Sequence, residues 1–348
     1  MTIDDRATEA DPAAAPSAPP GPVAPGRREI ARRALGSVPI LQIAVLAVVF
    51  LVAAFTIDGF LDRSSLYSDL VLAAFLGVAA TGQTLVILIG GLDLSVASVI
   101  SAANLTLPVL VAKGWPAGLA ILIVVLLGAL VGAVNGFVIR RWRVNSLIVT
   151  LASGGIVYGL ALAATNNGLA TGVVPSWLSS FSSPIGHTFG IEIPGVIVAW
   201  AILAVILGIL LGRAPVGRRV YATGANQTAA DLAGIRTLRV WVGCFAVSGA
   251  AAAATGVLLT GFVASASVGI GSPYLFTSLA AVVVGGTSLI GARGDYWRTV
   301  LGALILTLIT TILVAHGAGE AVEEAAYGFL ILLFVGVYGR ERRIRDQV

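Results

Sequence analysis

The chain has 348 residues, of which 57% are hydrophobic and only 11% charged, and its mean hydropathy is +0.98. A soluble domain needs a polar surface, so this composition excludes a water-soluble globular protein and indicates an integral membrane protein. The formal net charge of +4 is explained by membrane orientation and anionic lipid, and is no argument for nucleic-acid binding.

Residues 1–36 come before the first apolar run and are rich in Ala and Pro. Such a segment has too little apolar surface to fold, so we expect a disordered cytoplasmic tail. The run that follows is about a full span long and lacks a small-x-small cleavage site, so no cleaved signal peptide is predicted.

Apolar runs of roughly the length that crosses a hydrocarbon core predict an all-α, polytopic membrane protein with about ten transmembrane helices in residues 37–339. The ten runs are 38–57, 70–91, 94–112, 117–139, 146–164, 194–212, 240–263, 275–290, 299–314 and 326–337.

The positions of the basic residues support this count. With ten spans and both termini in the cytoplasm, 19 of the 21 basic residues lie on the cytoplasmic side, including a basic tail at 340–348. Only Arg63 and Lys113 lie outside. Because Lys and Arg are retained on the cytoplasmic side, this asymmetry predicts the orientation in a bacterial cell membrane.

The stretch GGLDLSV contains Asp93, the only Asp, Glu, Lys or Arg between Leu70 and Ala112. Gly90 and Gly91 can end one span, and the Asp93 carboxylate can cap the next by accepting from the amides of Ser95 or Val96. We therefore expect a tight turn at the cytoplasmic end of two spans. A structural role is favoured, and a functional one stays open.

Small uncharged polar residues accompany this turn. Their amides and hydroxyls can line a path for a neutral, hydroxyl-rich solute, or they can bond between helices, and both interpretations stay open. They are Gln83, Thr84, Ser95, Ser98 and Asn104, with Thr106. On the fourth run, Gly128, Gly132 and Gly136 share one face, which favours close packing against another helix.

The cytoplasmic segment 213–239 contains a second pattern. Asn226 is a good N-cap, residues 228–233 can form a short helix, and Gly234 suits its left-handed C-terminal cap. Such a helix can dock in a groove on a soluble partner, or it can be an interfacial connector that touches lipid headgroups.

Several chemistries are disfavoured. The only lysine is Lys113, in VAKGWP, so the chain has no Walker-type loop for ATP hydrolysis. Residues 240–292 contain no charged side chain, whereas ion-coupled carriers usually place ionisable groups within their spans. One cysteine, Cys244, excludes an intrachain disulfide and a Cys-based metal site, and no grouping in the spans predicts a catalytic or metal centre.

Four stretches, in this order, resemble the permease family of ribose-type ATP-binding-cassette importers for monosaccharides. They are GQTLVILIGGLDLSVAS (82–98), LIVTLASGGIVYGLAL (147–162), ATGANQTAADLAGIR (222–236) and LAAVVVGGTSLIGARG (279–294), followed by Thr299 and Gly302.

The resemblance implies a permease that forms the path for a sugar or sugar-like solute. It also implies a homodimer, separate cytoplasmic ATPase subunits that bind ATP and Mg, an extracytoplasmic solute-binding protein and no cofactor in this chain. The segment from Asn226 to Gly234 would be the coupling helix, with Ala229, Ala230 and Gly234 matching the family's A-A-x-x-x-G pattern and Thr228 standing where Glu is common.

The chain departs from the family where it reads PYLFTSLAA. Leu275 and Thr277 replace two acids, and Val263 stands in place of an upstream Arg. The solute and the direction of transport therefore stay open. Two alternative functions also stay open: a stand-alone secondary or facilitative carrier, and a membrane enzyme acting on lipid-linked substrates.

Overall fold

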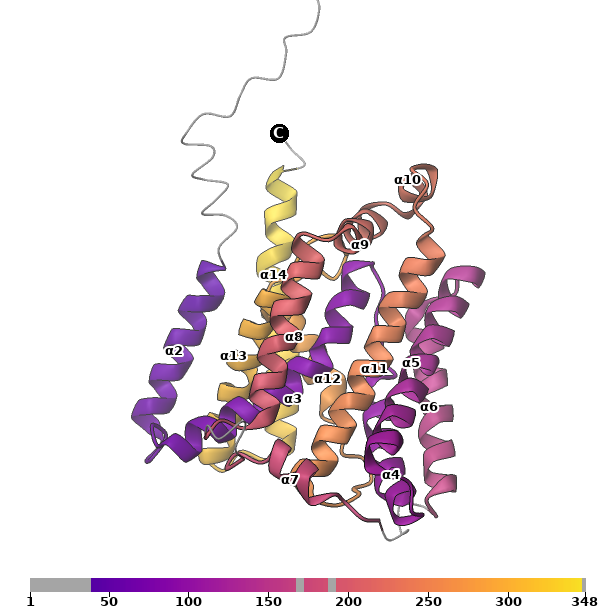
Figure 1. Cartoon of the computed structure of the whole chain (residues 1–348). Helices are drawn as coiled ribbons and strands as arrows, with labels where there is room; N and C mark the ends of the chain where they lie inside the picture. The colour runs from indigo at the N-terminus through magenta and orange to yellow at the C-terminus, as the bar shows by residue number, and fades with distance from the viewer. Residues whose placement is uncertain (1–38, 167–171, 187–191, 346–348) are drawn as a thin grey trace, which may run out of the picture. The chain divides into compact units, whose positions relative to one another are not determined.

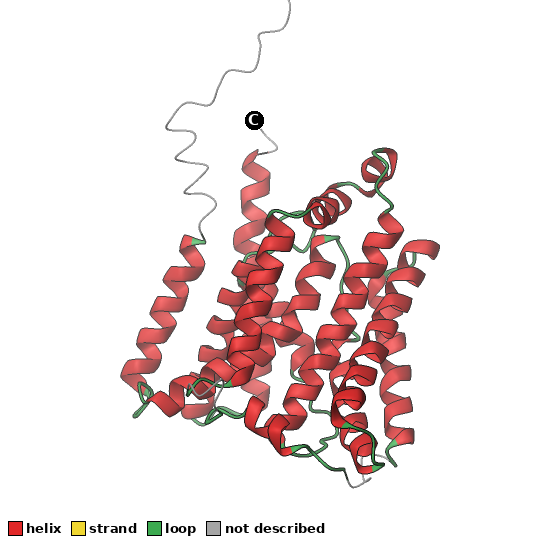
Figure 2. Ribbon diagram, viewed as in Figure 1, coloured by secondary structure: helices red, strands yellow, loops and turns green. Residues whose placement is uncertain are grey.

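The computed structural model describes residues 39–166, 172–186 and 192–345. Its contacts divide the chain into Met1–Pro39 and Ile40–Val348, and the fold described below is that of the second unit. The predicted tail at 1–36 lies outside the described residues. Within those residues the chain forms helices joined by loops and no strand, as Figure 2 shows. The predicted all-α class is confirmed.

Thirteen helices are present in the described residues, and Figure 1 labels them in chain order. They are α2 (Ile40–Thr56), α3 (Arg63–Leu88), α4 (Val96–Ala112), α5 (Ala117–Trp142), α6 (Ser146–Ala164), α7 (Ser176–Ser182), α8 (Gly195–Gly212), α9 (Pro215–Ala225), α10 (Gln227–Leu232), α11 (Thr237–Val263), α12 (Tyr274–Val284), α13 (Tyr296–Ala315) and α14 (Glu320–Arg345). Of the described helices, α3, α5, α6, α8, α11 and α13 are long and apolar enough to cross a membrane.

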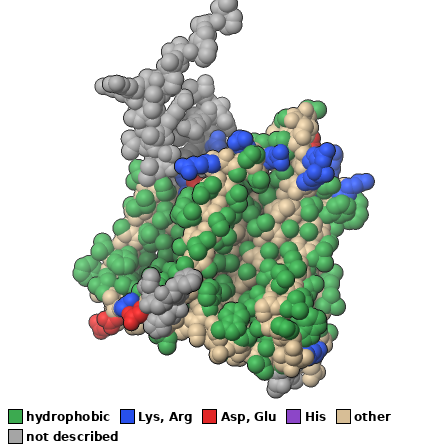
Figure 3. Space-filling view, in the orientation of Figure 1, with side chains coloured by type: hydrophobic (Ala, Val, Ile, Leu, Met, Phe, Trp, Pro, Cys, Tyr) green, Lys and Arg blue, Asp and Glu red, His purple; other side chains and the backbone are tan. Residues whose placement is uncertain are grey.

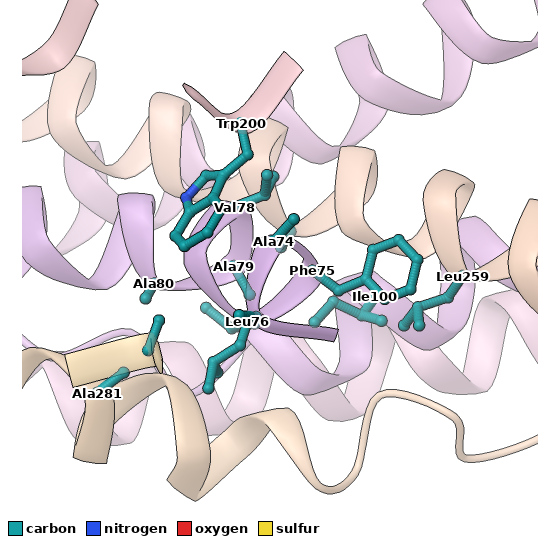
Figure 4. Close-up of a cluster of buried hydrophobic side chains, with 14 of the residues drawn as sticks. Ala74, Phe75, Leu76, Val78, Ala79, Ala80, Ile100, Trp200, Leu259 and Ala281 are labelled. Carbon is teal, nitrogen blue, oxygen red and sulfur yellow. The ribbon is translucent and has the colours of Figure 1, made fainter. Parts of the chain in front are cut away.

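Helix α3 is the most enclosed of these six, with 89% of its most apolar 18-residue stretch buried. Its sequence alternates small and large apolar residues (LAAFLGVAATG), so neighbouring helices approach it closely on all sides. Figure 4 shows this cluster, in which α3 is surrounded by side chains of α4, α8, α11 and α12. The labelled members are Ala74, Phe75, Leu76, Val78, Ala79 and Ala80 of α3, with Ile100, Trp200, Leu259 and Ala281.

The glycine stripe of α5 packs on α11, which confirms the predicted close approach. A Cβ atom added at Gly132 would lie 1.9 Å from the Phe245 carbonyl oxygen, and one at Gly128 would lie 2.5 Å from that of Gly249. A larger residue at either position would separate the two backbones. These two helices therefore form a closely packed pair within the described bundle.

The predicted span at 275–290 is wrong in its length. Helix α12 ends at Val284, where Gly286 adopts a left-handed φ of +96° and closes the C-terminal turn. Its 11 residues rise only about 16 Å, roughly half of a hydrocarbon core. Irregular backbone at 264–273 and 285–295 flanks this short helix, and such backbone is tolerated in a membrane where protein groups satisfy it. The count of ten spans stays a prediction.

Candidate functional site

The cytoplasmic segment folds into two short helices, α9 and α10. The side chain of Asn226 accepts from the amide of Ala229 at 2.9 Å and so caps α10, as predicted. After the helix, Gly234 adopts a φ of +80° and Ile235 donates its amide to the Ala230 carbonyl at 3.0 Å. The predicted N-cap and left-handed C-cap are confirmed, and α10 begins one residue earlier and ends one residue earlier than expected.

One face of α10 is not covered by any other part of the described chain. Thr228 and Ala229 are exposed, Ala230 is buried, and Leu232 is 86% exposed. Thr228, Ala229 and Leu232 together leave one side of this short helix uncovered. In Figure 1, α10 lies beyond the ends of α5 and α11. No sequence pattern pointed to Leu232 beforehand, although a leucine directly after A-A-D is a signal that could have identified it.

Helix α10 is bonded to the two long helices beside it. Arg140, in the last turn of α5, donates to Asp231 of α10 at 2.5 Å and to the Thr237 hydroxyl at 2.7 Å. Thr237, the first residue of α11, in turn donates to Asp231 at 2.6 Å. This three-residue set, called the α10 link below, joins the ends of α5, α10 and α11.

The Thr237 hydrogen bond and the Arg140 charge lower the pKa of Asp231 below its ordinary 3.8. The carboxylate of the link is therefore ionised throughout the physiological range. No motif pointed to Arg140 or Asp231, because the pairing joins positions 91 residues apart in the chain.

The glycine turn after α3 lies against the cytoplasmic segment. Gly90 has a φ of +83°, and α3 ends at Leu88, as the glycines predicted. The Leu88 carbonyl accepts from Ala292 at 2.9 Å, in the loop after α12. A Cβ at Gly224 of α9 would lie 1.9 Å from the same carbonyl. The end of α3 is thus in contact with both α9 and the second irregular loop.

From this turn the chain folds back beside α3, which places Asp93 at 0% exposure. The Gln83 amide nitrogen donates to the Asp93 carbonyl at 3.0 Å, and its oxygen accepts from the Asp93 amide at 3.3 Å. Because Gln83 is more than a turn before the end of α3, Asp93 lies deeper than the cytoplasmic turn that the sequence predicted.

The Asp93 carboxylate is satisfied by uncharged donors. Its Oδ1 accepts from the Ser95 amide at 3.0 Å, as predicted, and from the Ser95 hydroxyl at 2.5 Å. Its Oδ2 accepts from the Ser248 hydroxyl of α11 at 2.7 Å. Among the described residues no basic side chain forms an ion pair with it.

Three further helix positions hold the same loop. The Ser146 hydroxyl accepts from the Leu92 amide at 3.1 Å, and the Thr150 hydroxyl accepts from the Leu94 amide at 3.1 Å. Asn135 of α5 donates to the Ser95 hydroxyl at 3.2 Å. Residues 92–95 are therefore bonded to α3 and α6 through their backbone and to α5 and α11 through their side chains.

The predicted path residues lie at different places in this bundle. Gln83 and Ser95 belong to the Asp93 loop, Thr84 bonds to Thr299 of α13 at 2.8 Å, and Asn104 bonds to Thr260 of α11 at 2.8 Å. These four are buried, and Ser98 is half-buried next to Gly154 of α6. Each buried member bonds to a neighbouring segment, and their role as a path stays a prediction.

The segment that departs from the family pattern lies at the start of α12. Thr277 is 8% exposed and donates to the Pro273 carbonyl at 2.8 Å, whereas Val263, at the end of α11, is 45% exposed. The irregular stretch before α12 is bonded to α4, since Gly271 donates to Ser101 at 3.0 Å and Ser267 donates to Asn104 at 2.8 Å.

Comparison with known proteins places the chain in a family. A family model described as "Branched-chain amino acid transport system / permease component" matches residues 65–337. The chain is 33% identical to the ribose import permease protein RbsC of Haemophilus influenzae over 259 residues, which are 74% of this chain and 80% of that protein. It is likewise 33% identical to RbsC of Bacillus subtilis over 278 residues, covering 80% and 85% of the two chains.

A third relative is the autoinducer 2 import system permease protein LsrD of Salmonella typhimurium, 30% identical over 262 residues, which are 75% of this chain and 79% of that protein. No solved structure matches the chain. The chain therefore belongs to the ribose-type family of importer permeases, and it is a multi-pass transporter component of the bacterial inner membrane rather than an enzyme.

Proposed function

We propose that this chain forms the translocation path of an ATP-binding-cassette importer for a sugar or sugar-like solute and works as a homodimer. Separate cytoplasmic ATPase subunits bind ATP and Mg, and an extracytoplasmic binding protein delivers the solute. The observation that carries the proposal is α10, a capped cytoplasmic helix with Leu232 exposed at 86%. Its shape fits a groove on a soluble subunit.

The contacts of α10 supply a mechanism for coupling. A push on α10 by a closing ATPase is passed through Asp231 to Arg140 of α5 and Thr237 of α11. Since α5 and α11 are packed backbone to backbone at Gly132, they move as one body. Helix α9 touches the end of α3 at Gly224, so the same push also reaches the loop that holds Asp93. Rigid-body movement of this kind suits alternating access.

The named relatives support the solute class. RbsC is a ribose import permease and LsrD serves autoinducer 2 import, so a sugar-like, hydroxyl-rich compound is the class that we propose. The replacement of two acids at Leu275 and Thr277 and of a base at Val263 favours a solute other than ribose. Screening sugars and polyols for binding to the partner binding protein would identify it.

The proposal is tested by reconstitution. We expect vesicles that contain the full-length chain, its ATPase subunit and the loaded binding protein to take up solute only with Mg-ATP. Leu232→Glu is expected to abolish uptake and co-purification of the ATPase, because a charge cannot enter an apolar groove. The conservative variant Leu232→Met is expected to keep both uptake and co-purification of the ATPase. Uptake by the chain alone would make it a stand-alone carrier and overturn the proposal.

A further inference from the structure

A cavity of about 680 Å³ lies between α8 and α11, beneath the cytoplasmic segment. Its walls come from α3, α8, α9, the α10–α11 connection and α11. Leucines and valines dominate its apolar part, among them Leu207, Leu210, Leu211, Val216, Val240 and Val247. Its volume is within the usual range for small-molecule sites in proteins.

Three arginines also line the cavity: Arg219 of α9, Arg236 before α11, and Arg239 in the first turn of α11. All three are exposed, and none forms an ion pair with a side chain that the structure describes. By contrast, Arg140, on the other side of α10, is paired with Asp231. The cavity therefore combines an apolar interior with an uncompensated positive charge of three.

We propose that this cavity binds one anionic phospholipid of the cytoplasmic leaflet, with the phosphate held by Arg219, Arg236 and Arg239 and the acyl chains between α8 and α11. Guanidinium groups bind phosphate oxygens in pairs, and basic pockets between membrane helices on the cytoplasmic side suit anionic headgroups. The arginines would bind the phosphate of the headgroup, and the leucines and valines would contact the acyl chains. Both the charged and the apolar part of a phospholipid therefore find complementary side chains in the cavity.

The surface around the cavity favours a lipid over a protein as occupant. Leu210, Val216 and Val247 are 40%, 56% and 41% exposed, so the apolar wall continues onto the outer surface of the helices. Figure 3 shows basic side chains along the cytoplasmic edge and hydrophobic side chains covering the surface below them. A soluble subunit approaching α10 from the cytoplasm would not fill an apolar recess between α8 and α11, whereas a neighbouring lipid enters it sideways.

The cavity also touches the connection on which coupling depends. Gly234 and Ile235, in the turn that follows α10, form part of its wall. A bound lipid would occupy the space behind this turn and limit its movement. Lipid binding itself does not depend on the proposed transport function.

The test measures lipids retained by the purified full-length chain in native mass spectrometry, with phosphatidylglycerol and phosphatidylcholine as probes. We expect one tightly retained phosphatidylglycerol and no tightly retained phosphatidylcholine. In a triple variant with Arg219→Gln, Arg236→Gln and Arg239→Gln, affinity is expected to fall about a hundredfold, because each basic residue contributes about fivefold at an anionic surface. A matched triple variant, with Arg141→Gln, Arg218→Gln and Arg293→Gln outside the cavity, keeps the wild-type affinity.

A second variant fills the apolar part without touching the arginines. A Cβ at Gly243 would have no atom within 4 Å, so Gly243→Phe places a ring in the cavity without a backbone clash. We expect it to displace the retained lipid, whereas Gly118→Phe, equally free of contacts at the far end of α5, does not.

Equal retention of both probes by the wild type, or unchanged retention by both cavity variants, would overturn the proposal. So would a triple variant that loses its ATPase subunit while keeping the lipid, since the arginines would then be a protein contact.

Discussion

Asp93 illustrates how a carboxylate is accommodated inside a membrane protein without a cation. Two serine hydroxyls and one backbone amide donate to the carboxylate, and the Gln83 side chain bonds to the backbone of Asp93. A buried carboxylate needs hydrogen bonds to replace its hydration, and donors from two segments, the loop 92–95 and α11, supply them here. The carboxylate therefore bonds the loop 92–95 to α11, while the Gln83 side chain bonds the backbone of Asp93 to α3.

Replacing Asp93 tests this role. In Asp93→Asn one acceptor oxygen becomes an NH₂ group, so the Ser248 hydroxyl can accept from it but loses the acceptor for its own proton, and an unsatisfied buried polar group costs about 1–3 kcal/mol. We expect a lower unfolding temperature of the purified chain and reduced uptake. Ser248→Ala removes one donor and is expected to cost less. Asp62→Asn, at an exposed position whose side chain forms no capping bond, serves as the control. Unchanged stability and uptake in Asp93→Asn would make the carboxylate dispensable.

Gly234 is the second residue whose replacement is informative. A side chain at its φ of +80° is strained by about 1–2 kcal/mol, although a Cβ there would meet no neighbouring atom. Gly234→Val is therefore expected to shift α10, to lower uptake severely and to uncouple ATP hydrolysis, while the protein still inserts. Gly212→Val, at a contact-free glycine without positive φ, should transport normally. Normal uptake by Gly234→Val would contradict a coupling role for the turn.

At the scale of elements, the α10 link makes three helices depend on one another. Arg140, Asp231 and Thr237 are contributed by α5, α10 and α11, and the hydrogen bonds among them are all 2.9 Å or shorter. A six-residue helix is too short to be stable by itself, so its position is determined by such contacts and by its caps.

A double-mutant cycle measures the link. Arg140→Gln and Asp231→Asn are each expected to lower solute uptake per ATP hydrolysed, and the double variant should be no worse than the poorer single variant, because both remove one shared interaction. Arg141→Gln is the matched control. Additive losses would show that the two residues act separately.

The pH dependence of the same link follows from the lowered pKa of Asp231. A carboxylate whose pKa is lowered on folding stabilises the folded state fully above its ordinary value of 3.8. This stabilisation is lost only as the pH falls through the lower folded value. Coupling through the link is thus expected to be constant with pH above 3.8, measured as solute transported per ATP.

At the scale of the whole molecule, the orientation in the membrane can be tested with the single native cysteine removed as Cys244→Ser. Ile185 and Leu232 are 80% and 86% exposed and lie, in the predicted topology, on opposite sides. A membrane-impermeant maleimide is expected to label Ile185→Cys in intact cells and Leu232→Cys only in inverted vesicles. Labelling of Leu232→Cys from outside would overturn the predicted orientation.

The sequence by itself determined the membrane class, the helical fold and the caps of α10, because these depend on composition and on interactions within a few residues. Asn226 and Gly234 cap the turns next to them, and the glycines after α3 end that helix whatever packs around it. The same local reasoning placed the α5 glycine stripe at a helix contact without identifying its partner, α11.

Only the tertiary structure decided where the charged and polar groups meet. Ser248 lies 155 residues from Asp93, and Arg140 lies 91 residues from Asp231, so no local pattern could pair them. The shortened α12 has the same cause: its apolar run continues to Ile290, and the irregular backbone beyond Val284 is held by contacts such as the one from Ala292 to Leu88. The cavity between α8 and α11 arises likewise, since its arginines and its leucines come from helices that only the fold brings together.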